Sequence, residues 1–303
     1  MTQLSVRHVT RYRYQRPVRF GEHRLMFRPR DSHDLRLLDT ALVISPKAEV
    51  RWLHDVFSNS IAIASFEETA AELSFDSRIV IDHFGLDYPE FPIEPFAATY
   101  PFSYASEEVP DLGRTIERHY PDPDGQVDKW AKAFMSASGH TDTQDLLVRM
   151  TQAIGQQFAY ERRYAIGTQT PRETLEVGSG SCRDLALLMM EAARALGFAA
   201  RFVSGYLYDP QLDNQSESEI RGAGATHAWV QIYLPGAGWV EFDPTNGLVG
   251  GANLIRVAVA RDPRQALPLQ GNYFGFAEDF IDMSVEAEVR RVDEGPPRAA
   301  VGA

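Results

Sequence analysis

The chain has 303 residues, 44% of them hydrophobic and 24% charged, which predicts a soluble globular protein with a full core and about two domains. A formal net charge of -12 at pH 7 repels phosphate backbones and anionic lipids, so we expect neither a nucleic-acid nor a membrane partner. Cys182 is the only cysteine, which excludes an internal disulfide and any cysteine-based zinc or iron–sulfur site.

The sequence predicts neither a signal peptide nor a membrane-spanning helix. Residues 1–15 carry three arginines and lack the continuous apolar run of a signal peptide. The most apolar stretch, 185–196, is interrupted by Glu191 and Arg194 and is too short to cross a bilayer. Because a single cysteine also suits a reducing compartment, we expect a cytoplasmic protein.

Residues 1–87 have the pattern of antiparallel strands. Short runs rich in Val, Ile, Tyr and Phe are separated by turn signals, and side-chain polarity alternates over 61–66 and 78–84. Such alternation indicates strands with one buried face. We therefore predict an N-terminal antiparallel β-sandwich over 1–87.

The remainder of the chain divides into three parts. Residues 88–122 are rich in Pro, Tyr and Phe, and the prolines favour an extended connection packed along its neighbours. From residue 123 on, apolar residues recur at helical spacing, as over 127–135 and 146–154, and we predict a second domain over 123–293. Residues 294–303 are predicted to be a frayed tail.

Cys182 opens a predicted helix that ends near Gly197. A thiol at a helix N-terminus faces unpaired backbone N–H groups and the positive end of the helix dipole, both of which favour the thiolate. The alternative is an unreactive cysteine buried at a tight helix entry. The glycines before Cys182 do not predict a phosphate site, because Arg183 stands where a dinucleotide fingerprint has glycine and no P-loop lysine follows.

Two strands joined by a turn at 235–238 are predicted downstream, over 226–234 and 239–243. His227 on the first strand can take the thiol proton, and Asp243 on the second can hold the imidazole. If Leu234 paired with Trp239, these two side chains would point to opposite faces of the sheet. The candidate catalytic triad of Cys182, His227 and Asp243 therefore requires Leu234 to pair with Gly238 through a three-residue connection or an equivalent bulge.

Other side chains near these positions are weaker candidates. The backbone N–H of Cys182 is one donor to an oxyanion, and Tyr160 is a candidate for a second, with a packed aromatic as the alternative. Trp229 and Trp239 are candidate cleft walls, with packing on the sheet as the alternative. We assign Asp184, in the first turn of the helix, a structural role.

The loop over 209–224 carries several acids, and it would overhang the site. It predicts either an acidic rim that favours a basic or amine-bearing substrate, or simply a solvated loop. The other histidines are scattered without ligand spacing, so we expect no metal and no cofactor. The acidic residues of the loop are Asp209, Asp213, Glu217 and Glu219.

Four segments over about 155–250 together resemble the bacterial transglutaminase-like family, in its order of Cys, His and Asp. The strand-rich start resembles the N-terminal β domain often fused to that core, with Ser58 where glycine is expected, and 261–271 resembles the region that follows it. The resemblance implies an α+β fold with a papain-like core, in which a nucleophile-bearing helix packs on an antiparallel sheet that carries His and Asp. The segments are Gly180-Ser181-Cys182-Arg183-Asp184, 197–206, His227-Ala228-Trp229, 238–246 and, in the first domain, Asp55-Val56-Phe57-Ser58-Asn59.

The predicted reaction is thiol-dependent acyl transfer on amide bonds through a thioester, on a peptide or protein substrate. Water as the acceptor would make the protein a cysteine protease or amidase, which we favour, and an amine as the acceptor would make it a transglutaminase. A third possibility, of another class, is a binding module that uses the same cleft without turnover.

Overall fold

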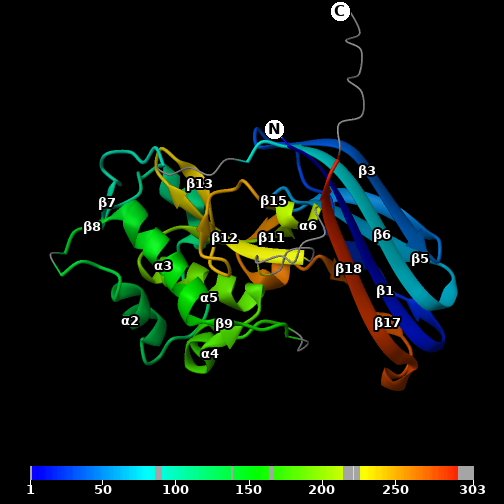
Figure 1. Cartoon of the computed structure of the whole chain (residues 1–303). Coiled ribbons are helices and arrows are strands. Elements are labelled where there is room, and N and C mark those ends of the chain that lie inside the picture. The colour runs from blue at the N-terminus through cyan, green and yellow to red at the C-terminus, as the bar shows by residue number, and fades with distance from the viewer. Residues whose placement is uncertain are drawn as a thin grey trace, which may run out of the picture.

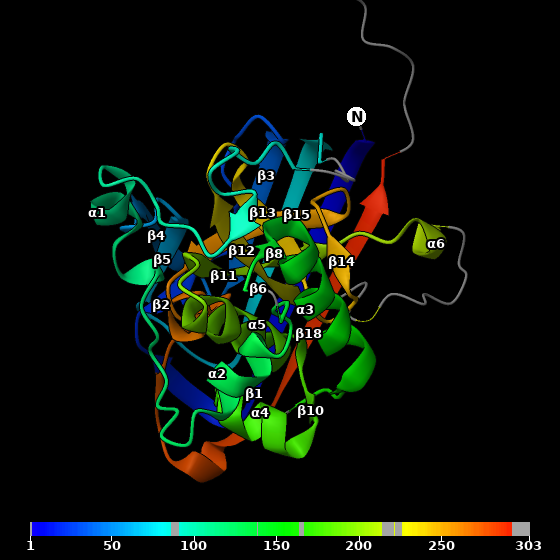
Figure 2. The same ribbon diagram turned by 90° about the vertical axis from the view of Figure 1, so that its left-hand side faces the viewer.

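The computed structural model describes residues 2–85, 91–137, 139–163, 167–213, 221 and 226–292. Long strands lie on one side of the molecule, and a sheet covered by helices lies on the other (Figure 1). Turned by 90°, the helices stand in front of that second sheet (Figure 2). The fold is α+β with antiparallel main sheets, as the sequence predicts.

Two antiparallel sheets form the N-terminal β-sandwich. The larger has the order β17-β1-β6-β3, with β18 also paired to β1, and the smaller has the order β16-β2-β5-β4. Phe20, Phe75 and Ala62 belong to the core between them. The strands are β1 (Thr2–Phe20), β2 (His23–Leu25), β3 (Leu35–Ser45), β4 (Ala48–His54), β5 (Ser60–Phe66), β6 (Thr69–His83), β16 (Leu269–Gln270), β17 (Tyr273–Phe274) and β18 (Phe280–Arg291).

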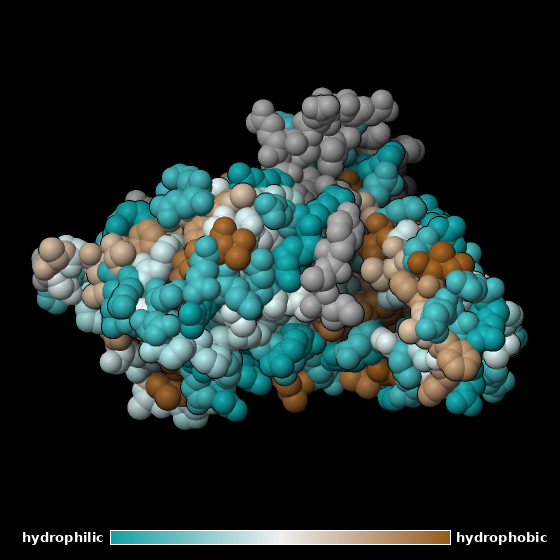
Figure 3. All heavy atoms as spheres, turned by 90° about the horizontal axis from the view of Figure 1, so that it is seen from below, coloured by the Kyte–Doolittle hydropathy of each residue, from teal (hydrophilic) through white to brown (hydrophobic). Residues whose placement is uncertain are grey.

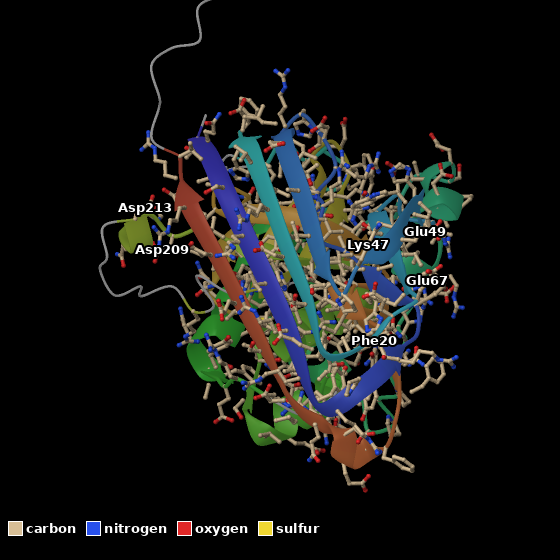
Figure 4. All side chains as sticks on the ribbon, turned by 90° about the vertical axis from the view of Figure 1, so that its right-hand side faces the viewer. Phe20, Lys47, Glu49, Glu67, Asp209 and Asp213 are labelled. Atoms are coloured by element: carbon tan, nitrogen blue, oxygen red, sulfur yellow. The ribbon has the colours of Figure 1, made fainter. Side chains whose placement is uncertain are left out.

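The last three strands depart from the predicted boundary between the domains. The sequence places 123–293 in the second domain, but β18 pairs with β1 along most of its length, and β16 joins the smaller sheet beside β2. Looking onto the larger sheet, β18, β1, β6 and β3 lie side by side (Figure 4). The reason is that β1 has a free edge after pairing with β6, and a strand from the far end of the chain satisfies its backbone groups.

The connection between the two domains is held along the second one. The hydroxyl of Tyr100 donates to the carbonyl of Leu196 at 2.9 Å, and that of Tyr104 donates to the carbonyl of Tyr233 at 2.9 Å. The connection contains no long helix among its described residues, although one short helix forms. Its elements are β7 (Thr99–Tyr100), α1 (Glu108–Leu112) and the 3-10 turn Gly113–Thr115.

The second domain is a five-stranded antiparallel sheet of order β14-β13-β12-β11-β15, with helices on one face. The face of β12 that carries Val230 and Ile232 shares a core with Leu185 and Leu188 of α5. The elements are α2 (Gln126–Lys132), β8 (Thr141–Asp142), α3 (Thr143–Gln157), β9 (Ala159–Tyr160), α4 (Pro171–Val177), β10 (Ser179–Gly180), α5 (Cys182–Ala195), β11 (Ala200–Leu207), α6 (Pro210–Asp213), β12 (Thr226–Leu234), β13 (Gly238–Asp243), β14 (Leu248–Val249), β15 (Leu254–Ala260) and the 3-10 turns Pro263–Gln265 and Ala277–Asp279.

Seen from below, hydrophobic residues form separated patches on a mostly hydrophilic surface (Figure 3). Within the described ranges, no helix combines the length and the hydropathy needed to cross a bilayer.

The two domains are joined by an apolar cluster and by one asparagine. Val6 and Ile81 of the larger sheet pack with Tyr206 and Ile255 of the second domain. Asn59 donates from Nδ2 to the carbonyl of Val259 at 2.7 Å and accepts from its N–H at 2.9 Å. Its amide thus makes the pair of hydrogen bonds to β15 that a neighbouring strand would make, and so connects the N-terminal domain to the sheet.

Ser58, in the turn before Asn59, has a φ of 62°, and it is the only described residue other than glycine with a positive φ. This explains why glycine is expected there, since the left-handed conformation costs an L-residue about 1–2 kcal/mol. Ser58→Gly should raise the free energy of unfolding by about 0.5 kcal/mol or more after the entropy of glycine is subtracted. Urea unfolding measures the change. Ser60→Gly, within β5, is the matched control and should be destabilising; a less stable Ser58→Gly protein would contradict the explanation.

Candidate active site

The N-terminus of α5 is fixed by the buried carboxylate of Asp184. Its Oδ2 accepts from the N–H of Ser181 at 2.8 Å and from the hydroxyl of Ser181 at 2.7 Å. Its Oδ1 accepts from the N–H of Gln169 at 2.7 Å and from Nη1 of Arg163 at 2.8 Å. The two Ser181 donors cap the helix in the turn before Cys182, and Gln169 and Arg163 tie the same carboxylate to the segment before α4, so Asp184 has a structural role.

Cys182 is the first residue of α5 and keeps 9% of its surface exposed. Its backbone N–H has no acceptor among the described residues, as expected in the first turn of a helix. Arg183, the next residue, donates from Nη2 to the carbonyl of Pro263 at 2.7 Å and lies over the ring of Phe202. The arginine therefore holds the helix start against the segment that follows β15.

The hairpin of β12 and β13 has the register that places His227 and Asp243 on one face. Leu234 pairs with Gly238, and Val230 pairs with Phe242, so the next position brings Asp243 opposite Trp229. The three-residue connection closes with a hydrogen bond from the N–H of Ala237 to the carbonyl of Leu234 at 3.0 Å. Gly238 has a φ of 74°, the left-handed conformation that the sequence analysis requires in this turn.

The side chains of His227 and Asp243 are in contact and fully buried. Nε2 of His227 lies 2.9 Å from Oδ2 of Asp243. The same Oδ2 accepts from Nδ2 of Asn246 at 2.8 Å, and Oδ1 accepts from the N–H of Thr245 at 3.0 Å. Asn246 and Thr245 lie within a motif of the sequence, but their role is visible only once the turn after β13 brings them back onto the carboxylate.

The charge on His227 is set by these contacts. Burial alone would lower the pKa of the imidazole, but the charge and the hydrogen bond of Asp243 outweigh it, Cys182 adds to the rise, and the pKa reaches about 10. Since Nε2 faces Asp243, Nδ1 is left to face the thiol; it is buried and has no hydrogen-bond partner among the described residues. At neutral pH the ring is therefore an imidazolium beside Cys182.

Trp229 lies behind the histidine rather than on a cleft wall. Its side chain is 0% exposed, which rules out the cleft role that the sequence suggests. The indole ring stacks on the imidazole of His227 with centroids 6.0 Å apart, and the indole N–H donates to Glu241. Arg256 also pairs with Glu241, with Nη1 and Oε1 2.8 Å apart. Trp229 therefore supports the ring of His227, and Glu241 and Arg256 in turn hold Trp229.

The weaker candidates separate into two groups. Tyr160 lies near the three residues: burial raises the pKa of its hydroxyl, and the charges of Cys182 and Asp243 raise it further. Trp239 is elsewhere, stacked by the guanidinium of Arg201 at 4.1 Å from its ring centroid.

The acidic loop is only partly described, since Glu217 and Glu219 lie outside the described residues. Asp209 is buried and accepts from the N–H of Gln211 at 2.9 Å. Asp213 accepts from the hydroxyl of Tyr208 at 2.6 Å. Asp213, which is exposed, also accepts from the N–H of Arg291 at 3.2 Å, and both acids lie beside β18 (Figure 4).

Comparison with known proteins gives two matching family models. Residues 4–82 match the bacterial transglutaminase-like N-terminal region, and residues 129–244 match the transglutaminase-like superfamily. The second match includes Cys182, His227 and Asp243.

Similar whole proteins are also found. An uncharacterized protein of Mycobacterium bovis is 27% identical over 93% of this chain and 91% of its own length. One of Mycobacterium leprae is 36% identical, but over only 35% of this chain and 37% of its own length. A crystal structure from Cytophaga hutchinsonii, named "a Putative Cysteine Protease", has a TM-score of 0.67 at 20% identity and covers 97% of this chain and 93% of its own. At that identity the likeness shows the fold alone.

Proposed function

We propose, on the premise that this chain is a member of the bacterial transglutaminase-like family, that it hydrolyses amide bonds in peptides or proteins through a thioester on Cys182. The observation that carries the proposal is the buried hydrogen bond of 2.9 Å between His227 and Asp243, which leaves the other ring nitrogen to the thiol. A cysteine with such a partner is the general arrangement for nucleophilic catalysis.

The chemistry follows from the charges. The proton of the Cys182 thiol resides on Nδ1 of His227, and the thiolate attacks the carbonyl carbon of the amide. The tetrahedral intermediate expels the amine, which takes the Nδ1 proton, and a thioester remains. Water then gives a proton to Nδ1 and attacks the thioester, which releases a carboxylic acid and returns the thiolate. Asp243 stabilises the imidazolium before and after the thioester and holds the neutral ring in place between these steps.

The oxyanion of each tetrahedral intermediate needs hydrogen-bond donors. The N–H of Cys182 is available, since it has no acceptor among the described residues. Tyr160 is the proposed second donor, because its hydroxyl is close enough to Cys182 for their charges to interact. Water is the proposed acceptor of the acyl group, as no described segment stands out as a site for an amine.

Alkylation tests whether His227 activates the thiol. Iodoacetamide should modify Cys182 rapidly at pH 6.5, and His227→Ala should slow this reaction at least about tenfold, because the positive charge beside the sulfur is lost. His54→Ala, at an exposed position of β4, is the matched control and should react like the wild type. Equal rates in all three proteins would favour a binding module that uses the cleft without turnover.

Incorporation of a fluorescent primary amine into a glutamine peptide separates the two reactions. A hydrolase releases the carboxylic acid and incorporates little amine, whereas efficient incorporation would identify a transglutaminase.

A further inference from the structure

A cavity of about 780 Å³ lies where the two domains meet. Residues 30–34, which follow β2, form one wall, and β11, β12, β13 and β15 form the other. Its volume is typical of a site for a small molecule. Neither Cys182 nor His227 lines it, so it is distinct from the candidate active site.

Arg201 of β11 is a partly buried cation of the sheet wall that forms no ion pair with a described carboxylate. Its Nε donates to Oε1 of Gln231 at 2.6 Å, and its guanidinium lies over the ring of Trp239. Among the described residues, its terminal amino groups have no hydrogen-bond partner and no carboxylate forms an ion pair with it. Burial lowers the pKa of Arg201 to about 10, against the raising effect of Glu241.

Arg256, in the same cavity, differs from Arg201 because it pairs with carboxylates. Its Nη1 lies 2.8 Å from Oε1 of Glu241, and its Nη2 lies 3.2 Å from Oδ1 of Asp34. Two carboxylates therefore neutralise the guanidinium of Arg256. The guanidinium of Arg201 has no such partner among the described residues and is available to an anionic ligand. Arg201 is only partly buried, so its terminal amino groups are open to a ligand, and a bidentate carboxylate is the partner whose geometry matches a guanidinium.

The remaining wall indicates the size and charge of that ligand. The apolar side chains of the lining can pack against the apolar part of a ligand whose charged group lies at the guanidinium of Arg201. Asp34 and Glu241 are also in the lining and oppose a ligand with several negative charges, whereas Arg30, Asp31 and His33 are all exposed on the loop. A monoanion fits this balance better than a phosphate dianion. The apolar lining residues include Phe57, Phe91, Pro92, Trp239, Val240 and Val257.

We propose that this cavity binds a small organic carboxylate, with the carboxylate paired to Arg201 and the apolar part of the ligand against Trp239. The site joins both domains, since a ligand there contacts the loop of the N-terminal domain and the sheet of the second at once.

Calorimetric titration with N-acetyl-L-phenylalanine and with its neutral amide tests the proposal. The carboxylate should bind with a Kd at least about tenfold lower than that of the amide, and Arg201→Gln should remove this difference. Arg28→Gln is the matched control, because Arg28 also lies over an aromatic ring, Trp52, but does not line the cavity. Equal binding of acid and amide to the wild type, or an undiminished preference in Arg201→Gln, would overturn the proposal.

A second variant covers the case in which Arg201→Gln does not fold. Gly251 lines the cavity, and a Cβ there would meet only the Cγ of Glu241, at an ordinary 3.6 Å. Gly251→Val therefore adds atoms at the cavity wall while Arg201 stays in place. It should raise the Kd of N-acetyl-L-phenylalanine several-fold, and unchanged binding would contradict the proposed location.

Discussion

Cys182→Ala is expected to lower the rate of peptide hydrolysis by about 10,000-fold or more, because no other group can form the thioester. The variant should fold normally, since alanine fits the space of a small side chain that is already almost buried and leaves the capping contacts of Asp184 unchanged. A peptide-library cleavage screen that compares the variant with the wild type measures the loss and also identifies the substrates.

The unfolding transition of the same preparation is the control for this experiment. A folded Cys182→Ala protein without activity supports a nucleophilic role for the sulfur. A folded variant that keeps more than about a tenth of the wild-type rate would exclude the thioester route.

Asp243→Asn is expected to lower the hydrolysis rate by about 10,000-fold, the effect of this change in other triads. Asparagine keeps the shape of the side chain but removes the charge that holds the pKa of His227 at about 10. Burial then dominates, and the imidazole loses its proton at neutral pH.

The same pair should make stability depend on pH. The folded pKa of His227 is raised above that of an unfolded histidine, to about 10. In the proposed thiolate–imidazolium pair that proton comes from Cys182, so between about pH 6.5 and 8.5 the folded and unfolded chains hold one proton each at these two groups. Above about pH 8.5 the unfolded cysteine loses its proton, and the free energy of unfolding should fall by about 1.4 kcal/mol per pH unit until the imidazolium is lost near pH 10. Urea unfolding between about pH 8.5 and 10 should show this slope in the wild type and a smaller one in Asp243→Asn. Identical slopes would mean that His227 is not an imidazolium in the folded protein.

The sequence predicts the central geometry because that geometry depends on short-range rules. Alternation along β12 and β13 fixes which side chains share a face, and only a connection that pairs Leu234 with Gly238 brings His227 and Asp243 together. The position of Cys182 follows from helical spacing and the glycine turn before it. These features involve neighbouring elements, so local pattern was sufficient.

The contacts that hold Trp229 against the ring of His227 cannot be predicted from the sequence. Glu241 shares a face with Trp229, but alternation does not reveal that a buried carboxylate accepts from the indole or that Arg256 neutralises it. The pairing of β18 with β1 was missed for a related reason. Apolar and polar residues alternate over 281–289, which indicates a strand. This local pattern does not predict that the strand pairs with β1, at the other end of the chain.

The most direct measurement is the mass of the intact protein after brief incubation with p-nitrophenyl acetate, a reagent that acylates activated nucleophiles. One acetyl group should appear on Cys182 of the wild type, be released by hydroxylamine, and form much more slowly in His227→Ala. Acetylation at the same rate in wild type and His227→Ala, or on residues other than Cys182, would contradict the proposed roles of the sulfur and its imidazole partner.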